Sequence, residues 1–117
     1  MLQMLLSKVK IGKFDFYSNI SPRTFPKGLD VEIFTMKALK IANEKADSQF
    51  DKEHVTPFIK KSNKFKKGNL LNKKNYSKVY ITLDKLEDLK KIRFIAKKIE
   101  PKFFFKWRKI IDIYKKF

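Results

Sequence analysis

Apolar residues recur along the chain at two spacings, which predict strands and helices in alternation. Residues 29–34 alternate apolar and acidic positions, as is typical of a strand with one buried face. Residues 84–99 and 102–117 carry apolar side chains at helical spacing, so each predicts an amphipathic helix. Asp84 and Glu87 stand three residues apart, which is the spacing of a helix-capping box.

Shorter segments complete this pattern. The β-branched and aromatic residues at 79–83 make the strongest strand prediction, and residues 14–18 and 65–71 make weaker ones. Thr35 is placed to cap a helix that begins directly after it, and another helix is expected near residues 52–60. Strands and helices that alternate in this way predict an α/β layered fold with three or four strands.

Composition excludes several classes of protein. The length of 117 residues suits one domain, and a hydrophobic content of 43% is enough to form a core. The chain has no cysteine, which excludes disulfides and cysteine-ligated metals, and the single histidine, His54, cannot make a zinc site alone. No apolar run approaches the ~20 residues that span a bilayer, so a cytoplasmic protein is expected.

The net charge of +17 lies almost entirely in the second half of the chain. Residues 1–58 hold nine basic and seven acidic residues, whereas residues 59–117 hold twenty basic and five acidic ones. Arginine, the usual residue for recognising phosphate and bases, occurs at only three positions. Lysine-rich composition of the whole chain is one explanation. The alternative is a small basic module that binds nucleic acid, with aromatic side chains as stacking platforms.

Three segments form motifs. They read Arg-Thr-Phe-Pro-Lys-Gly-Leu-Asp-Val-Glu-Ile-Phe at 23–34, Asp-Lys-Glu-His-Val-Thr-Pro-Phe-Ile at 51–59 and Thr-Leu-Asp-Lys-Leu-Glu-Asp-Leu at 82–89. In this order they resemble the C-terminal half of the spore-coat-polysaccharide-type cytidylyltransferases, relatives of the CMP-sialic acid and CMP-KDO synthetases. The chain departs from the family pattern at Lys52 and Tyr80, where the family usually has arginine, and at 85–86, where it has Thr-Pro.

The resemblance implies both a fold and a reaction. Residues 1–99 would form the C-terminal portion of a Rossmann-like, three-layer domain of the nucleotide-diphospho-sugar transferase type. Residues 100–117 would add an amphipathic helix packed on that domain, although this helix could also contact a second copy in a homodimer or lie on a membrane surface. The reaction would join CTP and an acidic sugar into a CMP-sugar for surface polysaccharide, releasing pyrophosphate with the help of Mg²⁺.

The resemblance also implies site residues, although it identifies no catalytic group. They are Asp84 as a Mg²⁺ ligand, Asp30 and Glu32 for sugar hydroxyls, Arg23 and Lys27 for anionic groups, and Glu53 and His54 for orienting the substrate. A carboxylate at a strand end that precedes a helix is well placed for a ligand, and Mg²⁺ is typically held by one or two carboxylates plus phosphates. The alternative is a helix cap for Asp84 and solvent exposure for the strand and loop residues.

The family's nucleotide-binding half has no counterpart in these residues. That half opens with a glycine-rich basic loop that holds the CTP phosphates, whereas Gly12, Gly28 and Gly68 are widely scattered here. The helical pattern also begins at Met1 without a cap. We therefore expect a truncated or split gene product, or a start assigned to an internal methionine, whose partner is the N-terminal half. A non-catalytic remnant or assembly partner is a further alternative.

Overall fold

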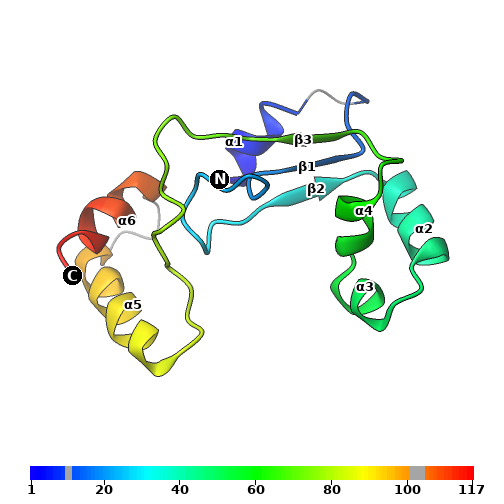
Figure 1. Cartoon of the computed structure of the whole chain (residues 1–117). Coiled ribbons are helices and arrows are strands. Elements are labelled where there is room, and N and C mark those ends of the chain that lie inside the picture. Colours follow the sequence, from blue (N-terminus) through cyan, green and yellow to red (C-terminus); the bar gives the residue numbers. More distant parts are fainter. Residues whose placement is uncertain (10–11, 101–104) are drawn as a thin grey trace.

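A small mixed sheet joins two groups of helices (Figure 1). The computed structural model describes residues 1–9, 12–100 and 105–117. Its elements are α1 (Leu2–Leu6), β1 (Phe16–Ser18), β2 (Glu32–Phe34), α2 (Met36–Lys45), α3 (Gln49–His54), α4 (Pro57–Lys61), β3 (Lys67–Asn69), α5 (Leu86–Ile99) and α6 (Trp107–Tyr114). This mixture of sheet and helices agrees with the α/β class predicted from the pattern.

The three strands lie in the order β2-β1-β3, with β1 antiparallel to β2 and parallel to β3. Because side chains alternate across a strand, the sheet has two different faces. On one face Phe16 packs with Ala38, Ala42 and Ile59 from α2 and α4. The other face carries a second cluster, composed of Leu5, Phe25 and Leu70 with Met1, Met4, Tyr17, Val31, Ile33 and Trp107.

Helix α2 begins as predicted. The Thr35 side chain accepts a hydrogen bond from the backbone N–H of Ala38, which satisfies one of the free donors of the first turn. The helix expected near residues 52–60 is instead two short helices. Helix α3 begins at Gln49 with Ser48 as its cap, and α4 begins at Pro57. Proline is well suited to the first turn because its missing N–H is not needed there.

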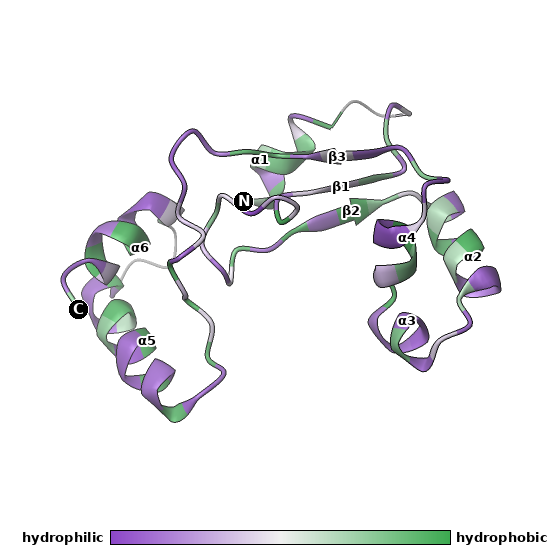
Figure 2. Cartoon of the chain, viewed as in Figure 1, coloured by the Kyte–Doolittle hydropathy of each residue, from purple (hydrophilic) through white to green (hydrophobic). Residues whose placement is uncertain are grey.

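Helices α5 and α6 form a third cluster of buried residues, Ile95, Ile99 and Ile113, with Ile81 and Ile110 partly buried against it. Figure 2 shows hydrophobic and hydrophilic residues mixed along both helices, as expected of helices with one buried face. The predicted last helix included residues 102–104, which lie outside the described residues. The division of the chain after residue 99 stays a prediction.

The strongest strand prediction is wrong in this structure. Among the described residues, the segment of residues 79–83 pairs through one isolated parallel bridge, between Tyr80 and Lys27. A strand needs hydrogen-bonded partners along its length, and within the described residues this segment forms strand pairing with a single loop residue. The predicted capping box is also wrong, because Asp88 rather than Asp84 accepts the backbone hydrogen bonds that begin α5.

The molecule is an open arch rather than a sphere (Figure 1). Its radius of gyration is 16.7 Å, whereas a compact domain of this length has a value of about 13 Å. Its accessible surface is 8888 Å², about a third more than a folded monomer of this mass exposes. Helices α2, α3 and α4 form one arm of the arch, called the α2–α4 arm below. Helices α5 and α6 form the other, the α5–α6 arm.

Candidate functional site

A pair of opposite charges closes the loop of the first motif. The guanidinium of Arg23 contacts both carboxylate oxygens of Asp30, with an Nη2–Oδ2 distance of 2.7 Å. The hydrogen bond from Arg23 holds the pKa of Asp30 below its ordinary value, and the same bond raises the pKa of Arg23. Arg23 and Asp30, two of the residues predicted to bind substrate, are therefore bound to each other, and this pair braces the loop.

The same loop contacts the segment that leads to Asp84. Lys27 donates its backbone N–H to the carbonyl of Val79, and its own carbonyl accepts from Ile81, both at 2.9 Å. Gly28 has a φ of 110°, and a Cβ there would lie 2.9 Å from the Ile81 side chain. Only glycine fits such a position. The loop of the first motif thus meets the segment that leads directly into the third motif, although about fifty residues separate them.

Glu32 belongs to a polar row that crosses all three strands. Ser18 lies opposite Glu32 on β2 and opposite Asn69 on β3, and its hydroxyl donates to Asn69 Oδ1 at 3.1 Å. The Glu32 carboxylate forms an ion pair with Lys60 of α4. The row lies at the carboxyl ends of β1 and β3, which are parallel, and ligands bind in open α/β sheets at such strand ends.

A cavity of about 290 Å³ opens beside this row. Ser18, Lys67 and Asn69 line it from the sheet, and Lys60 lines it from α4. Sequence reasoning missed all four residues. Lysine is so common in this chain that nothing distinguishes Lys60 or Lys67, and Asn69 lay in a weakly predicted strand. Only the register of the strands brings them beside Glu32.

The second motif spans the end of α3, the turn after it and the start of α4. The His54 ring packs against Phe50, with 4.4 Å between ring centroids, and both Glu53 and His54 are exposed. Val55 follows with a φ of 65° and a ψ of −54°, while the Thr56 N–H donates to the His54 carbonyl at 2.7 Å. This is a γ-turn with positive φ, a strained conformation for a β-branched residue.

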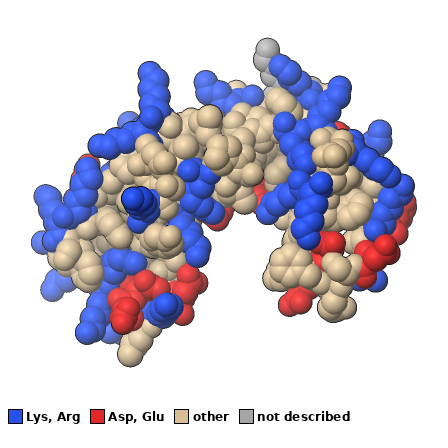
Figure 3. All heavy atoms as spheres, in the orientation of Figure 1, with Lys and Arg blue, Asp and Glu red and all other residues tan. Residues whose placement is uncertain are grey.

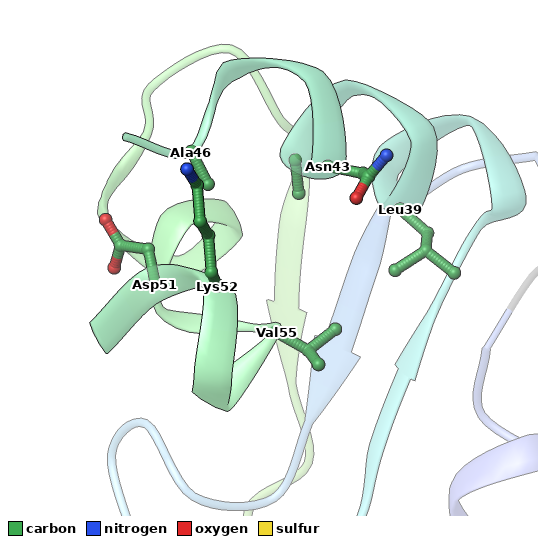
Figure 4. Close-up of a pocket in the computed structure, with 7 residues that line it drawn as sticks. Leu39, Asn43, Ala46, Asp51, Lys52 and Val55 are labelled. Carbon is green, nitrogen blue, oxygen red and sulfur yellow. The ribbon is translucent and has the colours of Figure 1, made fainter. Parts of the chain in front are cut away.

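A smaller cavity, of about 130 Å³, lies between α2 and α3. Lys52 and Val55 line it from one side, and Leu39, Asn43 and Ala46 line it from the other (Figure 4). Lys52 is the position at which the family pattern usually has arginine. The cavity places this motif against α2, away from Asp84 and from the loop of the first motif.

Asp84 is exposed and directly precedes Lys85, the N-cap residue of α5. Asp88 Oδ2 accepts from the backbone N–H groups of Asp84 and Lys85 at 3.1 and 3.0 Å, and Asp88 Oδ1 lies 3.0 Å from Lys91 Nζ. The hydrogen bond from Lys91 is the main reason that the pKa of Asp88 is lowered. Within the described residues, the Asp84 carboxylate has no hydrogen bond or ion pair, so it is free for a ligand.

The two arms flank a hollow, and the predicted residues come from the α2–α4 arm, from the sheet and from the segments before β2 and α5 instead of from one element. Figure 3 shows this hollow, with lysine and arginine spread over the upper side and acidic side chains at the free end of each arm. Glu53 and His54 belong to one arm, and Asp84 precedes the first helix of the other. In the parts of the chain that the structure describes, no group of three or more acidic or histidine residues could hold a metal. No described helix is long and apolar enough to cross a membrane.

No known protein-family model matches this chain. Individual proteins are nevertheless similar to it. A cytidylyltransferase from Leptospira borgpetersenii has a solved structure that matches 99% of this chain, with a TM-score of 0.82 and 28% sequence identity. The match covers 48% of that enzyme, so this chain spans about half of its length.

An uncharacterized protein of Methanocaldococcus jannaschii is 32% identical over 82 residues, which are 68% of this chain and 32% of the relative. Both matches therefore extend over only part of a longer protein. The Leptospira match agrees with the α/β fold and with the resemblance of the three motifs. The chain is thus similar, over nearly its whole length, to about half of a nucleotidyltransferase of the cytidylyltransferase type.

Proposed function

We propose that this chain supplies the sugar-binding part and one metal ligand of a cytidylyltransferase that joins CTP and an acidic sugar into a CMP-sugar. The observation that carries the proposal is the match of 99% of the chain to a cytidylyltransferase at a TM-score of 0.82. The three motifs support it, since Lys27 of the first motif pairs with the 79–81 backbone, which leads directly into the third. Surface polysaccharide would be the destination of the product.

The sugar would bind along the polar row. The Glu32 carboxylate and the Asn69 and Ser18 side chains can hydrogen-bond sugar hydroxyls, and Lys60 and Lys67 beside the cavity can face a carboxylate. Arg23 and Lys27 would meet anionic groups from the neighbouring loop, with Asp30 keeping Arg23 in place. Glu53 and His54 would orient the substrate from α3. Phosphoryl transfer depends mainly on such positioning and on charge stabilisation.

Mg²⁺ would be held jointly, by Asp84 of this chain and by ligands from elsewhere. Asp84 offers one free, exposed carboxylate, and Mg²⁺ is commonly held by one or two carboxylates together with substrate phosphates. When bound, the ion would neutralise the negative charge that develops on the phosphates. The remaining ligands, and the groups that hold CTP, would come from residues outside these 117.

The test measures CTP-dependent release of pyrophosphate with a panel of acidic sugars. The chain alone should show negligible release, and activity should appear when the unmatched half of the Leptospira enzyme is added. In the active mixture, Asp84→Asn should lower the rate more than about 100-fold, beyond the effect typical of residues that only support a metal ligand.

Glu87→Gln is the matched control, because Glu87 is also an exposed acid at the start of α5, and its rate should stay within about twofold. Substantial release by the chain alone would contradict the division of labour proposed here. Equal rates for Asp84→Asn and Glu87→Gln would contradict the metal-binding role of Asp84.

A further inference from the structure

In the parts of the chain that the structure describes, the segment of residues 79–83, called the 79–83 segment below, is hydrogen-bonded along one edge only. The Val79 carbonyl accepts from Lys27, and the Ile81 N–H donates to the Lys27 carbonyl. In a parallel bridge of this kind, the residue between the two bonded ones directs its own N–H and C=O to the opposite edge. The peptide groups of Tyr80 therefore face away from Lys27, and the two-residue period of a strand turns those of Thr82 the same way.

This opposite edge is open in the described parts of the chain. Neither Tyr80 nor Thr82 forms a backbone hydrogen bond there. The side chains nearby are also uncovered, because Tyr80 is 48% exposed, Leu83 58% and Leu86 79%. A sequence of such high β-propensity with free N–H and C=O groups is a ready template for pairing with another strand.

We propose that this edge binds a β-strand of the polypeptide that carries the rest of the fold shared with the Leptospira cytidylyltransferase. The proposal rests on the function proposed above and names how the two parts join. The Leptospira structure matches this chain over 99% of its length while about half of that enzyme remains unmatched, so a polypeptide of about equal size is left to place. The open arch has about a third more surface than a folded monomer of its mass, which provides room for it.

A second copy of this chain is a poorer occupant. Lys78 and Lys85 flank the segment, and both are exposed. Together with the net charge of +17, these lysines favour repulsion between two copies over pairing.

Pairing at this edge has a consequence for the metal ligand. Asp84 follows Leu83 directly, so a strand added to the 79–83 segment would determine what surrounds the Asp84 carboxylate. The free carboxylate and the free strand edge are then two signs of the same missing contact.

Amide hydrogen exchange tests the proposal, with the unmatched half of the Leptospira enzyme as the probe. In the 117-residue chain alone, the amides of Tyr80 and Thr82 should exchange rapidly, while that of Ile81, bonded to Lys27, should exchange more slowly. With the probe in excess, exchange at Tyr80 and Thr82 should slow at least about tenfold, as in other recognition by strand addition. The matched half of the Leptospira enzyme serves as the positive control for binding.

Thr82→Pro and Thr82→Val form a matched pair of variants. Proline removes the outward N–H, whereas valine keeps it together with a β-branched shape. The proline variant should bind the probe at least about tenfold more weakly than the valine variant. Unchanged protection of the Lys27 amide would show that the chain itself remains folded.

Three results would overturn the proposal. They are protection of Tyr80 and Thr82 in the chain alone, binding of the probe that leaves these amides unprotected, and failure of the probe to bind this chain while it binds the matched Leptospira half. Neither CTP nor Mg²⁺ is present, so the outcome is independent of activity. Protection without pyrophosphate release would contradict the proposed function alone, and release without protection would contradict this inference alone.

Discussion

The two arms of the molecule bury their apolar residues in different ways. In the α2–α4 arm, Ala38, Ala42 and Ile59 pack directly on Phe16 of the sheet. In the α5–α6 arm, the buried isoleucines pack mainly on one another, and Ile81 of the 79–83 segment is only partly buried against them. One arm thus covers a sheet, whereas the other lies beside a strand that has not become part of one.

This difference shows how a layered fold depends on its central sheet. A helix with one apolar face needs a second layer to cover that face. The α2–α4 arm finds this layer within the described residues. There the α5–α6 arm finds mainly its own two helices and a few side chains outside them, such as Phe25, whose ring lies 5.5 Å from that of Trp107 of α6. We therefore expect the two arms to unfold separately.

Phe16→Ala should produce the largest effect. Phe16 is 3% exposed and joins the sheet to α2 and α4. Removing a buried phenylalanine side chain costs about 3–5 kcal/mol, so the sheet and the α2–α4 arm should lose protection against amide exchange. The amides of α5 should keep theirs. Simultaneous loss in both arms would show that the chain unfolds as one unit.

Ile95→Ala tests the comparison from the other side. Ile95 is 6% exposed in the cluster between α5 and α6, and its truncation should destabilise that arm by about 3 kcal/mol. Thermal melting followed by residue-specific exchange should show α5 and α6 opening first, with Ala38 still protected. Lys97→Ala, at an exposed position of α5, is the control and should leave the melting temperature nearly unchanged.

Val55→Gly should stabilise the α2–α4 arm by about 1 kcal/mol. Val55 has a φ of 65°, which glycine adopts without steric cost, and part of this gain is lost to the greater freedom of glycine in the unfolded chain. Val55→Ala retains the Cβ and should show little of this gain. The midpoint of urea unfolding gives the measurement, and a glycine variant less stable than the alanine variant would contradict a strained backbone at this position.

Acidification should produce the smallest effect, and it should destabilise the start of α5 before the start of α2. Asp88 lies in the first turn of α5, and its pKa is lowered. The stability that its carboxylate contributes is therefore present above the ordinary pKa of about 3.9, and it is lost as pH falls through the pKa of Asp88 in the folded protein. Thr35, which caps α2, does not titrate. Exchange at the start of α5 should therefore accelerate below about pH 4 before that at the start of α2. Asp88→Asn should remove most of this pH dependence.

Local features were predicted best. Thr35 caps α2 as expected, because a cap requires only a side chain and an N–H three residues away. The alternation at residues 29–34 correctly separates two faces, with Ile33 and Val31 in one cluster and Phe34 against the other. The start of α5 was misplaced because both Asp84 and Asp88 can accept hydrogen bonds from free N–H groups, and only the backbone path decides between them.

The candidate site was predicted in its motifs but not in its contacts. Asp84 and Glu32 came from the resemblance, and their roles remain predictions. Lys60, which pairs with Glu32, and Asn69, which bonds Ser18, could not be chosen from sequence because their proximity depends on the strand register and on the position of α4. Contacts between residues far apart in the chain carry no local pattern.

The sequence by itself determined the alternation of helices and strands, the cap of α2, the three motifs and the charge of +17, because each depends on residue types and short spacings. Only the tertiary structure decided that the loop of the first motif meets the segment before the third motif, that a polar row crosses the sheet, and that the 79–83 segment is paired on one edge. A strand becomes part of a sheet only when a partner supplies N–H and C=O groups along its length. In the described residues that partner is Lys27 alone.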